Sequence, residues 1–162
     1  MHERRKTMQQ TKKTAKLILL VSLVLMLICG IAVSAIQTGG GSITMKELNF
    51  ETDEGYSMSA YLFIPDTATK DHPAPAIVTS HGYLNNKEMT DANYVELARR
   101  GFVVLSVDQP NHGDSEVTAD FSVISPSGVY QGVLALSRMP FVDKDKIGIT
   151  GHSIGSWSCN AA

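Results

Sequence analysis

The hydrophobic pattern divides the chain into one long apolar segment and a following region of shorter, alternating segments. The apolar segment runs from Leu17 to Ile36 without a charge, and Ser22 and Ser34 are its only polar residues. Its length matches the roughly 20 residues that a helix needs to cross a bilayer core. A buried helix of a soluble protein would carry a polar face, which this segment lacks. The pattern predicts a transmembrane helix over residues 17–36.

A cleaved signal peptide is the alternative explanation of this segment. Val33-Ser34-Ala35 resembles a small-residue cleavage site, but the apolar run exceeds the roughly 7–15 residues usual for a signal-peptide core. We therefore favour a retained anchor over secretion after cleavage near Ala35. Basic residues precede the run at positions Arg4, Arg5, Lys6, Lys12, Lys13 and Lys16. This asymmetry predicts a cytoplasmic N-terminus over residues 1–16 and an extracytoplasmic remainder.

The segment after the apolar run is predicted to be a linker over residues 37–45, because Thr38-Gly39-Gly40-Gly41-Ser42 has the composition of a flexible chain. A globular domain is expected over residues 46–162. Cys29 is interpreted as an apolar membrane residue. Cys159 is the only other cysteine, so the domain has no internal disulfide.

Strand and helix patterns alternate along this domain. Met58, Ala60, Leu62 and Ile64 recur at every second position, as in a strand with one buried face. Strands are predicted over 46–51, 56–64, 76–80, 102–107 and 146–150, and helices over 90–100, 125–138 and from about 154 onward. The first two strands are expected to pair antiparallel. The later alternation predicts a parallel sheet wound by right-handed crossovers.

Both longer helices carry signals at their ends. Gly101 stops the first helix, and Ser125-Pro126 is a favourable N-cap and first-turn pair for the second. The expected apolar stripes are Tyr94, Val95, Leu97 and Ala98 in the first helix, and Val129, Tyr130, Val133 and Leu134 in the second.

The most informative motif is Gly151-His152-Ser153-Ile154-Gly155, which follows the strand over 146–150. G-x-S-x-G after a strand is typical of a nucleophile elbow, and a serine hydroxyl becomes nucleophilic when a base takes its proton. The pentapeptide alone fits a helix-capping serine equally well. It also resembles the dinucleotide loop of a short-chain dehydrogenase, but Trp157 stands where that loop requires glycine.

A second motif, Ser80-His81-Gly82-Tyr83, follows the third strand, where an oxyanion-hole loop belongs. An oxyanion hole needs two backbone N–H groups aimed at the developing negative charge. The N–H groups of Ile154 and Tyr83 are the predicted pair. His81 is expected to hydrogen-bond within its own loop.

A third segment, residues 108–115, follows the fourth strand and is rich in turn formers. Asp108 and His112 are disfavoured as a metal site because no further ligands are spaced to complete it. His152 is disfavoured as the base for Ser153, because neighbouring residues at a strand end point to opposite sides. His72 lies in a polar loop and is expected to be solvated.

Taken together and in order, these motifs resemble an α/β-hydrolase, in the branch of dienelactone hydrolases and prolyl-oligopeptidase-type peptidases. The resemblance covers residues 46–162 and rests on Ser80-His81-Gly82, Asp108-x3-His112-Gly113-x-Ser115 and Val142-Asp143-x-Asp145 through Gly155. It implies a mostly parallel sheet with flanking helices, incomplete at its C-terminal end and preceded by one transmembrane helix. It implies Ser153 as nucleophile and the N–H groups of Tyr83 and Ile154 as oxyanion donors, with no metal or organic cofactor. Ser156 departs from the glycine of many relatives.

The expected function is a membrane-anchored serine hydrolase that cleaves ester, thioester or amide bonds through an acyl-enzyme. Its substrate would be a small molecule or a peptide with an acyl group, and the nearly balanced charge gives no indication of a nucleic-acid partner. The resemblance puts the triad acid and histidine beyond Ala162, so the 162-residue chain is expected to be an N-terminal fragment with little activity. The alternative is a non-catalytic, membrane-tethered binding module on the same scaffold.

Overall fold

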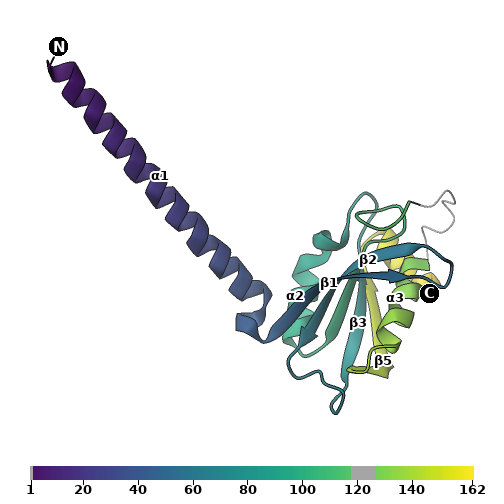
Figure 1. The fold of residues 1–162 in the computed structure, drawn as a ribbon. Helices are drawn as coiled ribbons and strands as arrows, with labels where there is room; N and C mark the ends of the chain where they lie inside the picture. Colours follow the sequence, from purple (N-terminus) through teal and green to yellow (C-terminus); the bar gives the residue numbers. More distant parts are fainter. Residues whose placement is uncertain (1, 118–126) are drawn as a thin grey trace. The chain divides into compact units, whose positions relative to one another are not determined.

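The chain forms two compact units, Met1–Gly40 and Gly41–Ala162, and the computed structural model describes residues 2–117 and 127–162 of them. The first unit consists of helix α1 (His2–Gln37), whose 36 residues would extend about 54 Å at 1.5 Å each (Figure 1). Its segment Met8–Gln37 is long and apolar enough to cross a membrane. The predicted apolar helix therefore exists, and it is a candidate transmembrane segment.

The second unit is built on a mixed five-stranded sheet with the order β1-β2-β4-β3-β5. The strands are β1 (Ile43–Glu51), β2 (Ser57–Pro65), β3 (Ala74–Ser80), β4 (Val103–Val107) and β5 (Val142–Gly151). β2 pairs antiparallel with β1 and β4, whereas β3 runs parallel to β4 and β5. The predicted antiparallel pair followed by a parallel sheet is confirmed.

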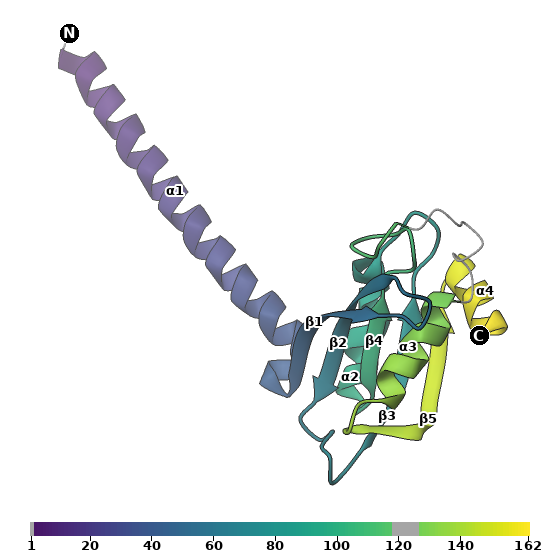
Figure 2. The same ribbon diagram turned by 45° about the vertical axis from the view of Figure 1, so that its right-hand side comes forward.

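Helices cover both faces of this sheet (Figure 2). They are the 3₁₀ helix η2 (Lys87–Thr90) and the α-helices α2 (Asp91–Arg99), α3 (Ser127–Ser137) and α4 (Ile154–Ala161). On β4, Val103, Leu105 and Val107 belong to the core that includes α3. Val104, between them, packs with Tyr94 of α2 on the other face. Because both faces of β4 are buried, its sequence is almost continuously apolar.

One sequence-based boundary and one helix face differ from the prediction. β1 begins at Ile43, inside the expected linker, because Ile43 pairs with Pro65 at the end of β2. On α3, Tyr130 is 48% exposed, although it was expected in the apolar stripe. The buried face holds Val129, as predicted, together with Gly132 and Leu136, which recur at helical spacing. The predicted helix start at Ser125-Pro126 lies outside the described residues.

The sheet has an open flank beside β5. β5 has β3 as its partner and lies at the end of the strand order. A groove of about 340 Å³ lies between β5 and α2, and it includes Leu97 and Ile149 in its walls. Ile149 is 40% exposed there. Among residues 2–117 and 127–162, no strand pairs with the other edge of β5.

Candidate active site

A short turn joins the end of β5 to the start of α4 and contains residues 151–155, hereafter the Ser153 turn. Ser153 has φ +56° and ψ −118°, a conformation that is costly for a residue with a side chain. Its side chain is exposed and makes no capping hydrogen bond to α4. Ser153 occupies the N-cap position of α4 but does not cap the helix with its side chain, which disfavours the interpretation as a helix-capping serine.

The Ser153 turn is packed too closely for side chains at its two glycines. A Cβ on Gly151 would lie 2.4 Å from the carbonyl carbon of Gly155. A Cβ on Gly155 would lie 2.5 Å from the Ser80 carbonyl oxygen and 2.7 Å from that of His81. The His152 N–H also donates to the Ser80 oxygen, at 3.1 Å. The glycines thus allow α4 to begin directly against the end of β3.

The loop after β3, residues 81–86, lies against this turn. A Cβ on Gly82 would be 3.4 Å from the Ser153 Cβ and 3.6 Å from the His152 oxygen. Within the described residues, the N–H groups of Tyr83 and Ile154 donate to no other protein group. For Ile154 this follows from its place in the first turn of α4, where N–H groups lack an intrahelical acceptor.

His81 is buried and hydrogen-bonds within its own loop, as predicted, and also to Gln109 after β4. Its Nδ1 is 2.7 Å from the Gly82 oxygen, and its Nε2 accepts the Gln109 N–H at 3.0 Å. These partners assign the proton of the neutral ring to Nδ1. Burial lowers the pKa of His81, which favours that neutral form. Both ring nitrogens are therefore occupied, so His81 is a structural residue.

Residues 108–115 contact the loop of residues 81–86 through the ring of His112. The ring centroid of His112 lies 5.0 Å from that of His81 and 5.9 Å from that of Tyr83, the latter edge to face. Such tilted pairs are favourable arrangements of aromatic rings. Among the described residues, no group of three or more potential metal ligands occurs. His112 of this segment therefore packs against the loop that bears Tyr83.

A buried ion pair beside this loop was not predicted from the sequence. The side chains of Lys87 and Asp108 are fully buried, with 2.8 Å between Nζ and Oδ2. Nζ also reaches Oδ2 of the exposed Asp114 at 2.6 Å. Burial alone would lower the pKa of Lys87, but the hydrogen bonds to Asp108 and Asp114 outweigh it and raise that pKa. Lys87 follows a polar loop, so no periodic pattern marked it as buried.

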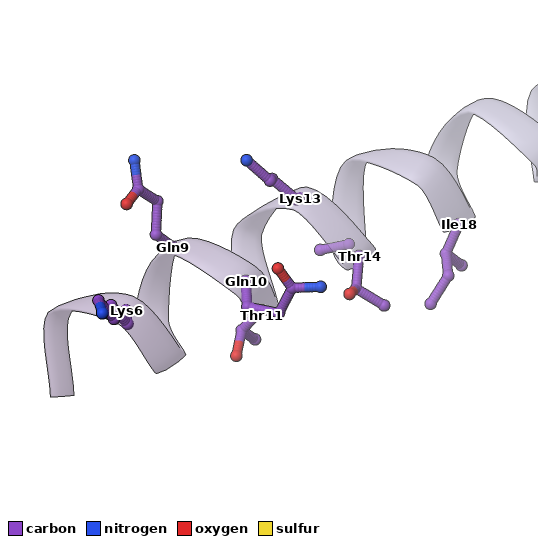
Figure 3. A pocket seen from close by; sticks show the side chains of 8 residues that line it. Lys6, Gln9, Gln10, Thr11, Lys13, Thr14 and Ile18 are labelled. Atoms are coloured by element: carbon purple, nitrogen blue, oxygen red, sulfur yellow. The ribbon is translucent and has the colours of Figure 1, made fainter. Parts of the chain in front are cut away.

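The remaining histidines and Cys159 make no side-chain contact described above. The side chains of His72 and His152 are exposed, and His152 takes part in the Ser153 turn through its backbone. Cys159 on α4 is half-buried, and burial raises the pKa of its thiol, as expected for a packing residue. Side chains near the start of α1 project outward from a single helix (Figure 3), so they form an open groove rather than an enclosed site.

The mixed sheet, its flanking helices and the strand-to-helix turn at Ser153 define this chain as an α/β-hydrolase. Residues 34–161 match the family described as "Esterase FrsA-like". The chain belongs to the FrsA-like esterase family.

Relatives and solved structures agree with this assignment. Esterase FrsA of Yersinia pestis (strain Pestoides F) is 29% identical over 122 residues, which are 70% of this chain and 27% of that protein. Esterase FrsA of Yersinia pseudotuberculosis (serotype O:1b, strain IP 31758) has the same identity and coverage. The chain therefore matches little more than a quarter of the length of these curated relatives.

Among solved structures, the hypothetical protein PA2218 of Pseudomonas aeruginosa is 26% identical with a TM-score of 0.59, over 67% of this chain and 35% of that one. DcsB in complex with its substrate analogue is 25% identical with a TM-score of 0.58, over 69% and 38%. The Pyrococcus furiosus esterase Pf2001 shares the fold, with 20% identity, a TM-score of 0.53 and coverage of 75% and 47%.

Proposed function

We propose that Ser153 is the nucleophile of a hydrolase that cleaves acyl bonds in esters, thioesters or amides. The observation that carries this proposal is the conformation of Ser153, an exposed serine held at φ +56° with no capping bond to α4. Backbone strain of this kind clusters at active sites, where surrounding contacts maintain it. A serine raised on a strand-to-helix turn is the arrangement that α/β-hydrolases use to expose their nucleophile.

The proposed reaction begins when the Ser153 hydroxyl oxygen bonds to the carbonyl carbon of the substrate. A base accepts the hydroxyl proton, and the carbonyl oxygen becomes an oxyanion. The N–H groups of Tyr83 and Ile154 donate to that oxyanion, because they flank Ser153 and lack protein acceptors among the described residues. The bond to the leaving group then breaks, and the leaving group takes the proton. Water later cleaves the acyl-enzyme by the same route.

The base and its acid are proposed to follow Ala162 in the complete protein. The relatives support this, because the matched region covers only 27% of their length. His81 is unsuited to be the base, since it is buried and both its nitrogens are engaged. No step of this mechanism calls for a metal or an organic cofactor.

The hydrolase is further proposed to be tethered to a membrane through residues 17–36, with its N-terminus in the cytoplasm. The apolar stretch of α1 supports this, and so do the basic residues that precede it. The substrate would then be a small molecule or a peptide with an acyl group outside the cytoplasm.

A fluorophosphonate probe tests the nucleophile directly, because it modifies activated serines covalently. We expect the complete protein to be labelled and the Ser153→Ala variant to be unlabelled. Ser156→Ala is the matched control. It removes an exposed hydroxyl that donates to the Gly151 oxygen at 2.5 Å, and it should retain labelling because the close glycine packing of the turn is unchanged. Labelling that persists in Ser153→Ala would overturn the assignment, and an unlabelled complete protein would favour a non-catalytic binding module. The 162-residue chain alone should show almost no ester turnover.

A further inference from the structure

The buried ion pair described above lies at one end of the loop that carries Tyr83. Lys87 donates to Asp108 twice, from its backbone N–H to Oδ1 at 2.6 Å and from Nζ to Oδ2 at 2.8 Å. The Asp114 N–H donates to the same Oδ2 at 2.9 Å. Each oxygen of the buried carboxylate therefore has at least one donor, and Lys87 is bound through both its backbone and its side chain.

The surroundings of this pair are built closely around it. A Cβ on Gly113 would lie 2.2 Å from the Asp108 carboxylate carbon, so a glycine there allows the segment to wrap around the carboxylate. The Lys87 ammonium also lies 5.0 Å from the centre of the Tyr61 ring on β2. A buried charge pair is expensive in desolvation and is weak support for stability by itself. Stability alone is therefore a weak explanation for the buried Lys87–Asp108 pair.

The location of the pair indicates that role. The loop begins at His81, which accepts a hydrogen bond from the Gln109 N–H at 3.0 Å, and it is followed directly by Lys87, which is bound to Asp108. Between these ends, the ring of Tyr83 rests against His112. One segment, residues 108–114, thus holds both ends and the middle of the loop. The Tyr83 N–H makes no hydrogen bond among the described residues, and it belongs to the part of the loop that these contacts hold in place.

We propose that Lys87, Asp108 and Asp114 are positioning residues that hold the Tyr83 N–H at the oxyanion of the reaction. The inference rests on the function proposed for Ser153 and adds which residues fix the position of the Tyr83 N–H. Donors stabilise a transition state best when their position is set in advance, so that no reorganisation accompanies the reaction. The three residues touch neither the substrate nor Ser153, and their effect passes through the loop.

The test compares variants of the complete protein with p-nitrophenyl butyrate as substrate and phenylboronic acid as a mimic of the tetrahedral intermediate. Loss of one oxyanion donor lowers kcat by about 10²–10³-fold, so a misplaced donor should cost less. For Lys87→Met we expect kcat to fall about 10–100-fold, with KM within about twofold. The inhibition constant of phenylboronic acid should rise by the same factor as kcat/KM falls.

Titration of active sites with a fluorophosphonate separates positioning from folding. Rates are expressed per labelled site, so molecules that fail to fold do not count. A merely structural role would lower the number of labelled sites and leave kcat per site and boronate affinity unchanged, and that outcome would overturn the proposal. Lys146→Met is the matched control, because Lys146 forms an exposed ion pair with Asp143 at 2.8 Å, and it should leave every quantity unchanged.

If Lys87→Met does not fold, a milder variant tests the positioning role. Asp114→Asn removes one partner of Lys87 at an exposed position, where the side chain is 70% accessible. It should lower kcat per site and boronate affinity together, by about 2–5-fold, and an unchanged kcat per site would contradict the proposal. A wild-type protein that is not labelled at Ser153 would instead refute the proposed function, so the two failures are distinguishable.

Discussion

Replacing Gly155 by alanine tests whether the Ser153 turn depends on the close approach of α4 to β3. The added Cβ would lie 2.5 Å from the Ser80 carbonyl oxygen. Even a close C–H···O contact has a carbon–oxygen distance of about 3.3 Å, so the two backbones must separate by about 0.8 Å. Neither obstacle is a flexible side chain, because the next atom, 2.7 Å away, is the His81 carbonyl oxygen.

The separation has two measurable consequences. Overpacking of this kind costs about 1–3 kcal/mol of unfolding free energy, and a backbone obstacle favours the upper end of that range. Because Ser80 and His81 lead into the Tyr83 loop, the shift also moves one proposed oxyanion donor away from the other. A displacement near 1 Å can cost about 10²-fold in rate, so fluorophosphonate labelling should slow by about 10–100-fold.

The assay measures the labelling rate and the urea midpoint of the complete protein in detergent micelles. Gly148→Ala is the matched control, because the same substitution on β5 would place a Cβ 3.8 Å from Ile77 and 3.9 Å from the Ala76 oxygen, both ordinary contacts. We expect this control to match wild type in both measurements. If Gly155→Ala and Gly148→Ala behave alike, the close packing inferred for the turn is refuted.

Three further predictions concern pH and the membrane. Burial lowers the pKa of His81, so its contribution to stability is present above about pH 6.5 and is lost as the pH falls below that value. The unfolding free energy of His81→Gln should therefore fall less than that of wild type on acidification. An equal fall in both proteins would contradict the prediction. The hydrogen bonds to Asp108 and Asp114 raise the pKa of Lys87 despite its burial. The unfolding free energy of Lys87→Met should therefore be roughly 3–5 kcal/mol below that of wild type, and this difference should persist until the pH exceeds about 10.5. A difference that disappears below about pH 10 would contradict the buried ion pair. Leu27→Arg puts a charge at the centre of the apolar stretch, which costs about 2.5–3.5 kcal/mol of membrane-insertion free energy. This variant should be released from membranes by a carbonate wash, whereas Gln9→Arg should stay bound. Retention of both variants would refute the proposed membrane span.

The order of strands and helices could be predicted from the sequence because each element carries its own periodicity. On β2, Met58, Ala60 and Leu62 were expected on one face, and all three lie in the same core. The face of α3 was predicted less well. Apolar residues occur on both sides of that helix, and the close approach of Gly132 to Val78 and Val107 decides which side is buried.

The candidate site was predictable only where a short motif reports on local backbone geometry. The motif around Ser153 pointed to a sharp turn, and Ser153 is indeed one of the described non-glycine residues at positive φ. Its role as a nucleophile stays a prediction. The bond between Lys87 and Asp108 joins residues 21 positions apart and depends on β3 lying beside β4. Spacing along the chain carries no signal for such a contact.

The strained backbone at Ser153 also carries a cost in folding stability. A conformation of this kind costs about 1–3 kcal/mol, a sizeable part of the roughly 5–15 kcal/mol by which domains are stable. Glycine at this position would relieve the strain, because it adopts positive φ at little cost. The Ser153 hydroxyl is therefore present at a cost in folding stability that a glycine would avoid.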